Sequence, residues 1–118
     1  ATARQMAARM ATLAPWNGMR GHVYGVTGGR DTAIAVLRRL EATPQTLWFR
    51  NMAVAVVQLA LDDTSGALTA LERATDAGEI WPNFSAVLDP LYDPIRQSPR
   101  WAALIRRVGL ESVPGVIR

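Results

Sequence analysis

The sequence predicts an all-α fold, a stack of antiparallel helical hairpins closed by a Pro-rich segment and a C-terminal capping helix. Two segments, residues 31–41 and 65–75, align at a spacing of 34 residues. In each of them small and apolar residues recur at i, i+4 and i+7, which is one stripe of an α-helix. A period near 34 residues with helical stripes is typical of stacked helix–turn–helix pairs. Near the C-terminus, three Asp-Pro or Ser-Pro pairs indicate the starts of helical turns.

We expect one domain over residues 1–118, divided in order along the chain. Residues 1–13 form the remnant of a preceding hairpin, 15–42 the first repeat, 44–78 the second, 79–110 the cap and 111–118 a tail that little holds in place. Gly28 and Gly29 form the turn of the first hairpin, because glycine tolerates positive φ. The first helix also carries Gly18, Gly21 and Gly25, so packing has to stabilise it against the intrinsic cost of about 0.5–1 kcal/mol for each helical glycine.

The second half of the chain follows the same logic. Residues 44–61 are apolar on nearly all sides, which predicts a helix buried between neighbours. Residues 62–65, Asp-Asp-Thr-Ser, end this helix and offer N-cap residues for the next one. The pairs Asp89-Pro90, Asp93-Pro94 and Ser98-Pro99 predict two short turns and a final helix over 99–108. Gly109 stops that helix. The aromatic residues expected in the core of the cap are Trp81, Phe84, Tyr92 and Trp101.

The composition of the chain excludes several classes of function. Apolar residues make up 49% of the 118 residues and charged ones 19%, a globular composition. Cysteine is absent, which excludes disulfides, thiolate catalysis and Cys-ligated zinc. No apolar run is long enough for a membrane span, and no signal peptide opens the chain, so we expect a cytoplasmic protein. The first residue is Ala1 and not Met, which indicates a fragment or a processed chain.

These segments resemble tetratricopeptide repeats (TPR). Aligned on the alanines, Gly21 and Ala55 take the small position of each first helix and Tyr24 the aromatic position. The packing positions of the second helices are taken by Ala33, Leu37, Leu40, Ala67, Leu71 and Ala74. The resemblance implies a right-handed stack in which helices cross closely at small residues. Residues 21–31 and 88–110 look like the C-terminal TPR region of bacterial multidomain regulators, in which repeats follow a DNA-binding, kinase or cyclase domain.

The resemblance also implies where a partner would bind. In such stacks the first helix of each repeat lines a concave surface, so the candidate partner-binding residues are Phe49, Met52, Val56, Leu59 and His22. If the first hairpin covers residues 48–60, the same apolar side chains are simply core, and this alternative stays open. His22 is the only histidine, and the spacing of the chain offers no partner residue for it as a catalytic base.

We therefore expect a non-catalytic protein–protein interaction module, a fragment of a larger bacterial signalling or transcriptional regulator. It needs no cofactor and no metal, because neither acidic grouping has the ligand spacing of a calcium loop, and Gly25-Val-Thr-Gly28-Gly29 lacks the ending of a phosphate loop. The alternative is a structural or dimerisation domain without a separate ligand. Nucleic-acid binding is a third reading, through the paired arginines Arg38, Arg39, Arg106 and Arg107, although a net charge of +3 spread along the chain disfavours it.

Overall fold

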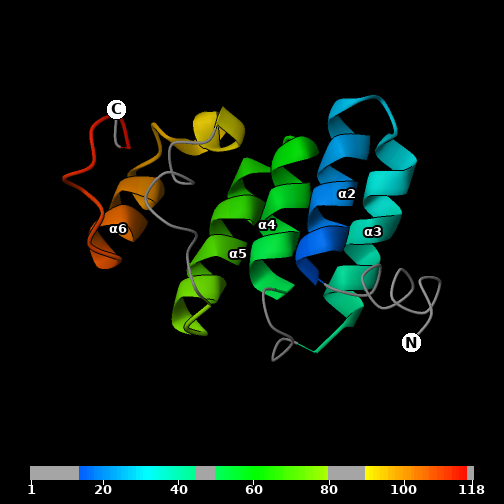
Figure 1. Ribbon diagram of the computed structural model, residues 1–118, viewed down its shortest axis with the longest axis horizontal. Helices are drawn as coiled ribbons and strands as arrows, with labels where there is room; N and C mark the ends of the chain where they lie inside the picture. Colours follow the sequence, from blue (N-terminus) through cyan, green and yellow to red (C-terminus); the bar gives the residue numbers. More distant parts are fainter. Residues whose placement is uncertain (1–13, 45–49, 80–89, 117–118) are drawn as a thin grey trace, which may run out of the picture.

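The computed structural model describes residues 14–44, 50–79 and 90–116. Within these ranges every regular element is a helix, so the all-α prediction is confirmed for this part of the chain (Figure 1). The residues predicted as an N-terminal remnant, 1–13, lie outside the described ranges. In chain order the elements are α2 (Ala14–Val26), α3 (Arg30–Ala42), α4 (Arg50–Ala60), α5 (Thr64–Asp76), the 3₁₀ helix η2 (Pro90–Ile95) and α6 (Pro99–Arg107).

The helices α3 and α5 correspond in length and in their spacing along the chain. They have 13 residues each, and α5 starts at Thr64 and ends at Asp76, in both cases 34 positions after the corresponding end of α3. Ala33 and Ala67, the small residues on which the predicted repeat was aligned, are both completely buried. The 34-residue spacing in the sequence therefore corresponds to two helices of equal length whose aligned alanines are both buried.

The turns that precede these two helices are also equivalent. Gly28 has a φ of 91° and Asp62, 34 residues later, has a φ of 61°. In each turn the next amide donates a hydrogen bond to the carbonyl five residues earlier, with N···O distances of 2.7 Å for Gly29 and 2.9 Å for Asp63. Glycine adopts this left-handed conformation without strain, whereas aspartate does so at a cost. The Asp63 carboxylate then caps α5 by accepting a hydrogen bond from the Gly66 amide at 3.0 Å.

The helix α4 lies at the centre of the molecule and contacts α2, α3, α5 and η2 (Figure 1). Eight of its eleven residues are buried, which confirms the predicted burial for the described part of residues 44–61. Two of the buried residues, Arg50 and Asn51, are polar and form a network described below. The apolar core around α4 includes Val36, Leu40, Val57, Leu68, Leu71, Tyr92, Ile95, Trp101, Leu104 and Ile105.

The helix α6 starts as predicted, and one short helix precedes it. The Ser98 hydroxyl accepts a hydrogen bond from the Arg100 amide at 3.2 Å, with Pro99 in the first helical turn, so α6 starts at the predicted residue. The two short turns predicted at Pro90 and Pro94 are joined in one six-residue 3₁₀ helix, η2, which has three residues per turn.

The predicted loose tail is wrong for residues 111–116. Val116 is completely buried. Its carbonyl accepts a hydrogen bond from the Trp101 indole Nε1–H at 2.7 Å. The Trp101 ring in turn lies against Tyr92, with ring centroids 5.3 Å apart. Tyr92 and Trp101 thus form part of a core as predicted, while Trp81 and Phe84 lie outside the described residues.

None of the helices in the described ranges combines the length and the apolar character that crossing a membrane would require.

Candidate functional site

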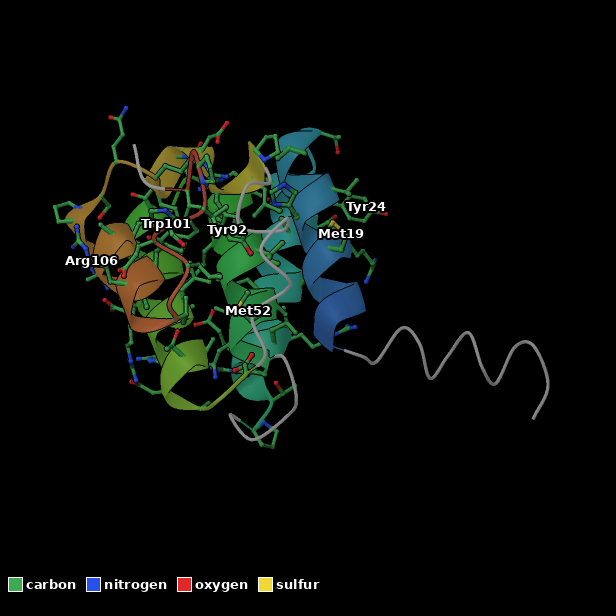
Figure 2. The ribbon with its side chains drawn as sticks, turned by 60° about the vertical axis from the view of Figure 1, so that its left-hand side comes forward. Met19, Tyr24, Met52, Tyr92, Trp101 and Arg106 are labelled. Carbon is green, nitrogen blue, oxygen red and sulfur yellow. The ribbon has the colours of Figure 1, made fainter. Side chains whose placement is uncertain are left out.

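The predicted partner-binding residues do not form an exposed surface. Met52 and Leu59 are each 4% exposed, and Met52 lies in the middle of the molecule (Figure 2). Val56 is half-buried, and Phe49 lies outside the described residues. The prediction that Met52 and Leu59 lie on the surface is therefore wrong, because α4 has neighbouring elements on most of its sides. The alternative reading of this stripe as core is the one that the described residues support.

His22 has a structural hydrogen bond. Its Nδ1 lies 2.9 Å from the carbonyl oxygen of Val56, which stands 34 residues later on α4. A carbonyl can only accept, so Nδ1 is the donor. The imidazole thereby joins α2 to α4 and is half-buried between them.

The contact between α2 and α4 is unusually close, because glycines of α2 face small residues of α4. A methyl group built on Gly18 would lie 2.8 Å from the Cα of Ala53, and one on Gly25 would lie 2.7 Å from the Cβ of Ala60. Such distances are shorter than any carbon–carbon contact that close packing allows. The glycines that looked costly in the sequence are thus the residues that let two helices touch along their backbones.

A third glycine completes this contact. A methyl group on Gly21 would lie 2.7 Å from a methyl carbon of Val57 and 3.0 Å from one of Val36. The three pairs advance in the same direction along both helices, so α2 and α4 run parallel. Gly21 was predicted to be a packing residue, and it is buried at the point where α2, α3 and α4 meet.

The other side of α2 is apolar and exposed. Met19 and Val23 are each 50% exposed, and Val26 is 60% exposed. These three residues have the spacing i, i+4 and i+7 and form one stripe along the helix, which we call the α2 outer stripe. Met19 lies on the outer side of α2, away from Met52 and the core (Figure 2). A shallow depression of about 440 Å³ at this place is lined by Met19, Arg20, Val23 and Tyr24.

Tyr24 belongs to this exposed region, so its predicted packing between the helices is wrong. Its side chain is 41% exposed. The ring lies over the turn after α2, since a methyl group on Gly29 would be 2.9 Å from the ring atom Cδ1. The Arg20 guanidinium carbon is 5.6 Å from the ring centroid, within cation–π distance. Tyr24 points away from α4 and finds its contacts on its own hairpin.

The remaining predicted packing residues lie in the interior. Ala33, Ala55, Ala67, Leu71 and Ala74 are completely buried, and Leu40 nearly so. Leu37 is partly buried and packs against the same core.

A buried polar network links the ends of three helices. The Arg50 guanidinium donates to the carbonyls of Leu40 and Glu41 at 3.1 and 3.0 Å, and to the Asn51 side-chain oxygen at 3.0 Å. The Glu79 carboxylate accepts from Asn51 Nδ2 at 2.6 Å. It also accepts from the backbone amides of Asn51 and Met52 at 3.3 and 3.1 Å. A cation thus lies at the C-terminus of α3 and an anion at the N-terminus of α4, as the helix dipoles favour.

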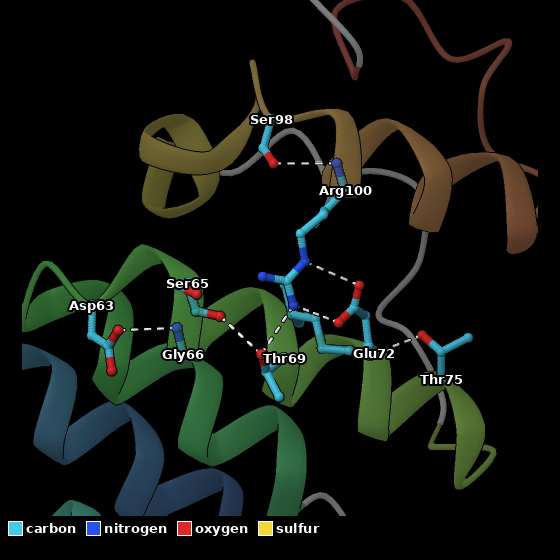
Figure 3. A network of polar contacts seen from close by, with 9 residues as sticks. Asp63, Ser65, Gly66, Thr69, Glu72, Thr75, Ser98 and Arg100 are labelled. Atoms are coloured by element: carbon cyan, nitrogen blue, oxygen red, sulfur yellow. Dashed lines mark hydrogen bonds and ion pairs between the residues drawn. The ribbon is translucent and has the colours of Figure 1, made fainter.

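A second polar cluster joins α5 to α6 (Figure 3). Arg100 forms a fork with Glu72, at 3.2 Å from Nε and 2.5 Å from Nη2, and donates to the Thr69 hydroxyl at 2.9 Å. This hydrogen bonding by Arg100 holds the pKa of Glu72 below its ordinary value of 4.5. The bonds to Glu72 likewise raise the pKa of Arg100. Both side chains are 39% exposed, so the pair contributes less than about 1 kcal/mol to stability.

The described residues form neither a metal-binding cluster nor a single basic patch. In the described part of the chain, no three His, Asp or Glu side chains are close enough to hold a metal ion. Arg38 and Arg39 lie on α3, at the end of the stack opposite to α6 with Arg106 and Arg107, so the four do not form one basic patch (Figure 1). Arg107 also pairs with Asp76 at 2.6 Å.

Comparison of the chain with protein-family models, with curated proteins and with solved structures found no match. The candidate site therefore rests on the geometry of α2. The sequence reasoning missed Met19, Val23 and Val26, although a signal was present. On a helix with glycines at 18, 21 and 25, bulky apolar residues at 19, 23 and 26 form a second stripe, and one helix cannot bury both stripes against a single neighbour.

Proposed function

We propose that this chain is a non-catalytic protein–protein interaction module whose binding surface is the α2 outer stripe, Met19, Val23 and Val26. The observation that carries the proposal is the exposure of these three side chains, each half exposed or more, beside the Arg20–Tyr24 pair. Large apolar side chains gathered on one exposed helix face are typical of contact sites for other proteins.

We infer further that the fold is a TPR-like stack that belongs to a larger bacterial regulator. Three features support the stack: the 34-residue offset of α3 and α5, the equivalent turns at Gly28 and Asp62, and the parallel contact of α2 with α4 through glycines. The place in a regulator rests on the resemblance of residues 21–31 and 88–110 alone. The bond of His22 to the Val56 carbonyl supports a structural role for the lone histidine.

The test compares two charge substitutions in the full chain. Val23→Asp places a carboxylate in the middle of the stripe, and the matched control, Ala103→Asp, places one on the exposed side of α6. We expect both variants to keep the circular dichroism of the parent, because both positions are exposed. Partner proteins captured by the parent chain should be captured by Ala103→Asp and lost by Val23→Asp.

Sedimentation decides between the proposal and its alternative. A dimer that persists on dilution in the parent and dissociates in Val23→Asp would favour a dimerisation domain over a module with a separate partner. Capture of the same proteins by the parent and by Val23→Asp would remove the stripe as the binding surface.

A further inference from the structure

The α2 outer stripe has an internal counterpart that shows how such a stripe is covered in this fold. Ala53, Val57 and Ala60 of α4 stand 34 positions after Met19, Val23 and Val26 and have the same i, i+4, i+7 spacing. Each of these three α4 residues is the one met by a glycine of α2. The face of α4 covered by α2 is thus equivalent to the face that α2 exposes.

Resting on the proposed function, we propose that the α2 outer stripe is a stacking face for a helical hairpin other than those of this chain. The contact helix of that hairpin runs parallel to α2 and carries glycine or alanine at positions i, i+3 and i+7, the spacing of Gly18, Gly21 and Gly25. Small residues are needed because Met19 and Val26 project further from their helix than their counterparts Ala53 and Ala60 do from α4. The partner is therefore a folded pair of helices and not an extended peptide.

The two ends of the described stack support this partner. Terminal units of repeat stacks carry a polar outer face, which keeps them soluble. The end formed by α5 has its covering elements, η2 and α6. The end formed by α2 has an apolar stripe 50–60% exposed and so lacks the character of a terminal unit.

A second copy of this chain fits the stripe poorly. A two-fold interface through the stripe brings each patch against itself, so the two Arg20 guanidinium groups beside the stripe would approach each other. A copy could not offer its own glycine stripe instead, because Gly18, Gly21 and Gly25 are already in contact with α4.

The experiment adds one repeat to the full chain. A second copy of residues 14–47, one repeat length, is inserted before Ala14, so that the glycines of the copy are in register with the original α2. A matched version also carries Met19→Ala and Val26→Ala in the original α2, which reproduces the residues of α4 at all three contacts. We measure urea unfolding and the hydrogen exchange of the amides in residues 18–26.

We expect the inserted hairpin to unfold together with the rest of the chain in a single transition with a larger denaturant dependence. The exchange rate of the amides in the original α2 should fall by a factor of about ten or more, since stacking raises the free energy of local opening. If only the matched version behaves in this way, the native stripe is not a stacking face and the inference fails. If neither version does, it fails as well.

The failure of this inference can be told from the failure of the proposed function. If the insertion does not stack but Val23→Asp still loses its captured partner, the stripe binds a partner of another shape. A parent dimer that Val23→Asp dissociates would replace the hairpin by a second copy. Only unchanged capture by Val23→Asp removes the interaction surface itself.

Discussion

The two ends of the helical stack differ in how far their apolar side chains are covered. At one end, α5 is covered by η2 and α6, with Trp101 fully enclosed and an ion pair, Arg100–Glu72, at the rim. At the other end, α2 packs against α3 and α4 through one of its sides, and on its other side Val26 is 60% exposed. The difference teaches that, within the described residues, the α6 end buries its large apolar side chains whereas the α2 end exposes some of them.

The largest expected effect comes from breaking the closed end. Trp101→Ala removes a buried indole, its hydrogen bond to the Val116 carbonyl and its contact with Tyr92. We expect a loss of about 3–5 kcal/mol in the free energy of unfolding, measured by chemical denaturation. Val23→Ser at the open end should change it by less than about 0.5 kcal/mol. Similar losses in the two variants would contradict the contrast between the ends.

A smaller effect is expected in the middle of the stack. Gly18→Ala places a methyl group 2.8 Å from the Cα of Ala53, and backbone cannot move aside as a side chain can. We expect a loss of about 1–3 kcal/mol, from overpacking. If alanine instead stabilised the protein by about 1 kcal/mol, as it does in an unobstructed helix, the close contact of α2 with α4 would be disproved.

A small effect is expected at the rim of the closed end. The pKa of Glu72 is lowered in the folded protein, chiefly by hydrogen bonds from Arg100. The folded state therefore binds this proton less tightly than the unfolded state. The contribution of the pair is fully present above the ordinary pKa of 4.5 and is lost as the pH falls below it. We expect Glu72→Gln to destabilise the protein by less than about 1 kcal/mol at pH 7.

The check is the pH dependence of unfolding in both proteins. The difference between parent and Glu72→Gln should shrink as the pH falls from 5 to 3. A difference that grows toward low pH would mean that the fork with Arg100 does not form in solution.

The sequence predicted those parts of the fold that follow from local pattern. Ala33 and Ala67 are buried one repeat apart, and Ser98-Pro99 starts α6, because stripes and caps are properties of short segments. The contact of Glu79 with Asn51 was not predictable in this way, since it joins residues 28 positions apart that share no pattern. The burial of Arg50, which is 6% exposed, was not predictable either, since its hydrogen bonds to the carbonyls of Leu40 and Glu41 join two separate helices.

The candidate site was harder to predict for a related reason. Periodicity tells which residues share a face, but the order of stacking decides which faces are covered. Met52 was chosen for its apolar helix, and the neighbours of α4 enclose it. Met19 lies on a helix whose glycines indicate close packing, and the sequence alone does not show which side of that helix is covered. The covered side of α2 and its exposed side are distinguishable only once α4 is known to meet the glycines.

The carboxylate of Glu79 couples the end of α5 to the start of α4. It follows the end of α5 in the chain, yet it caps the first amides of α4, while Arg50 at that same point caps the last carbonyls of α3. When the last turn of α5 frays, two amides of α4 lose their acceptor at the same moment. The start of α4 therefore depends on the end of α5, and we expect the two hairpins to unfold together.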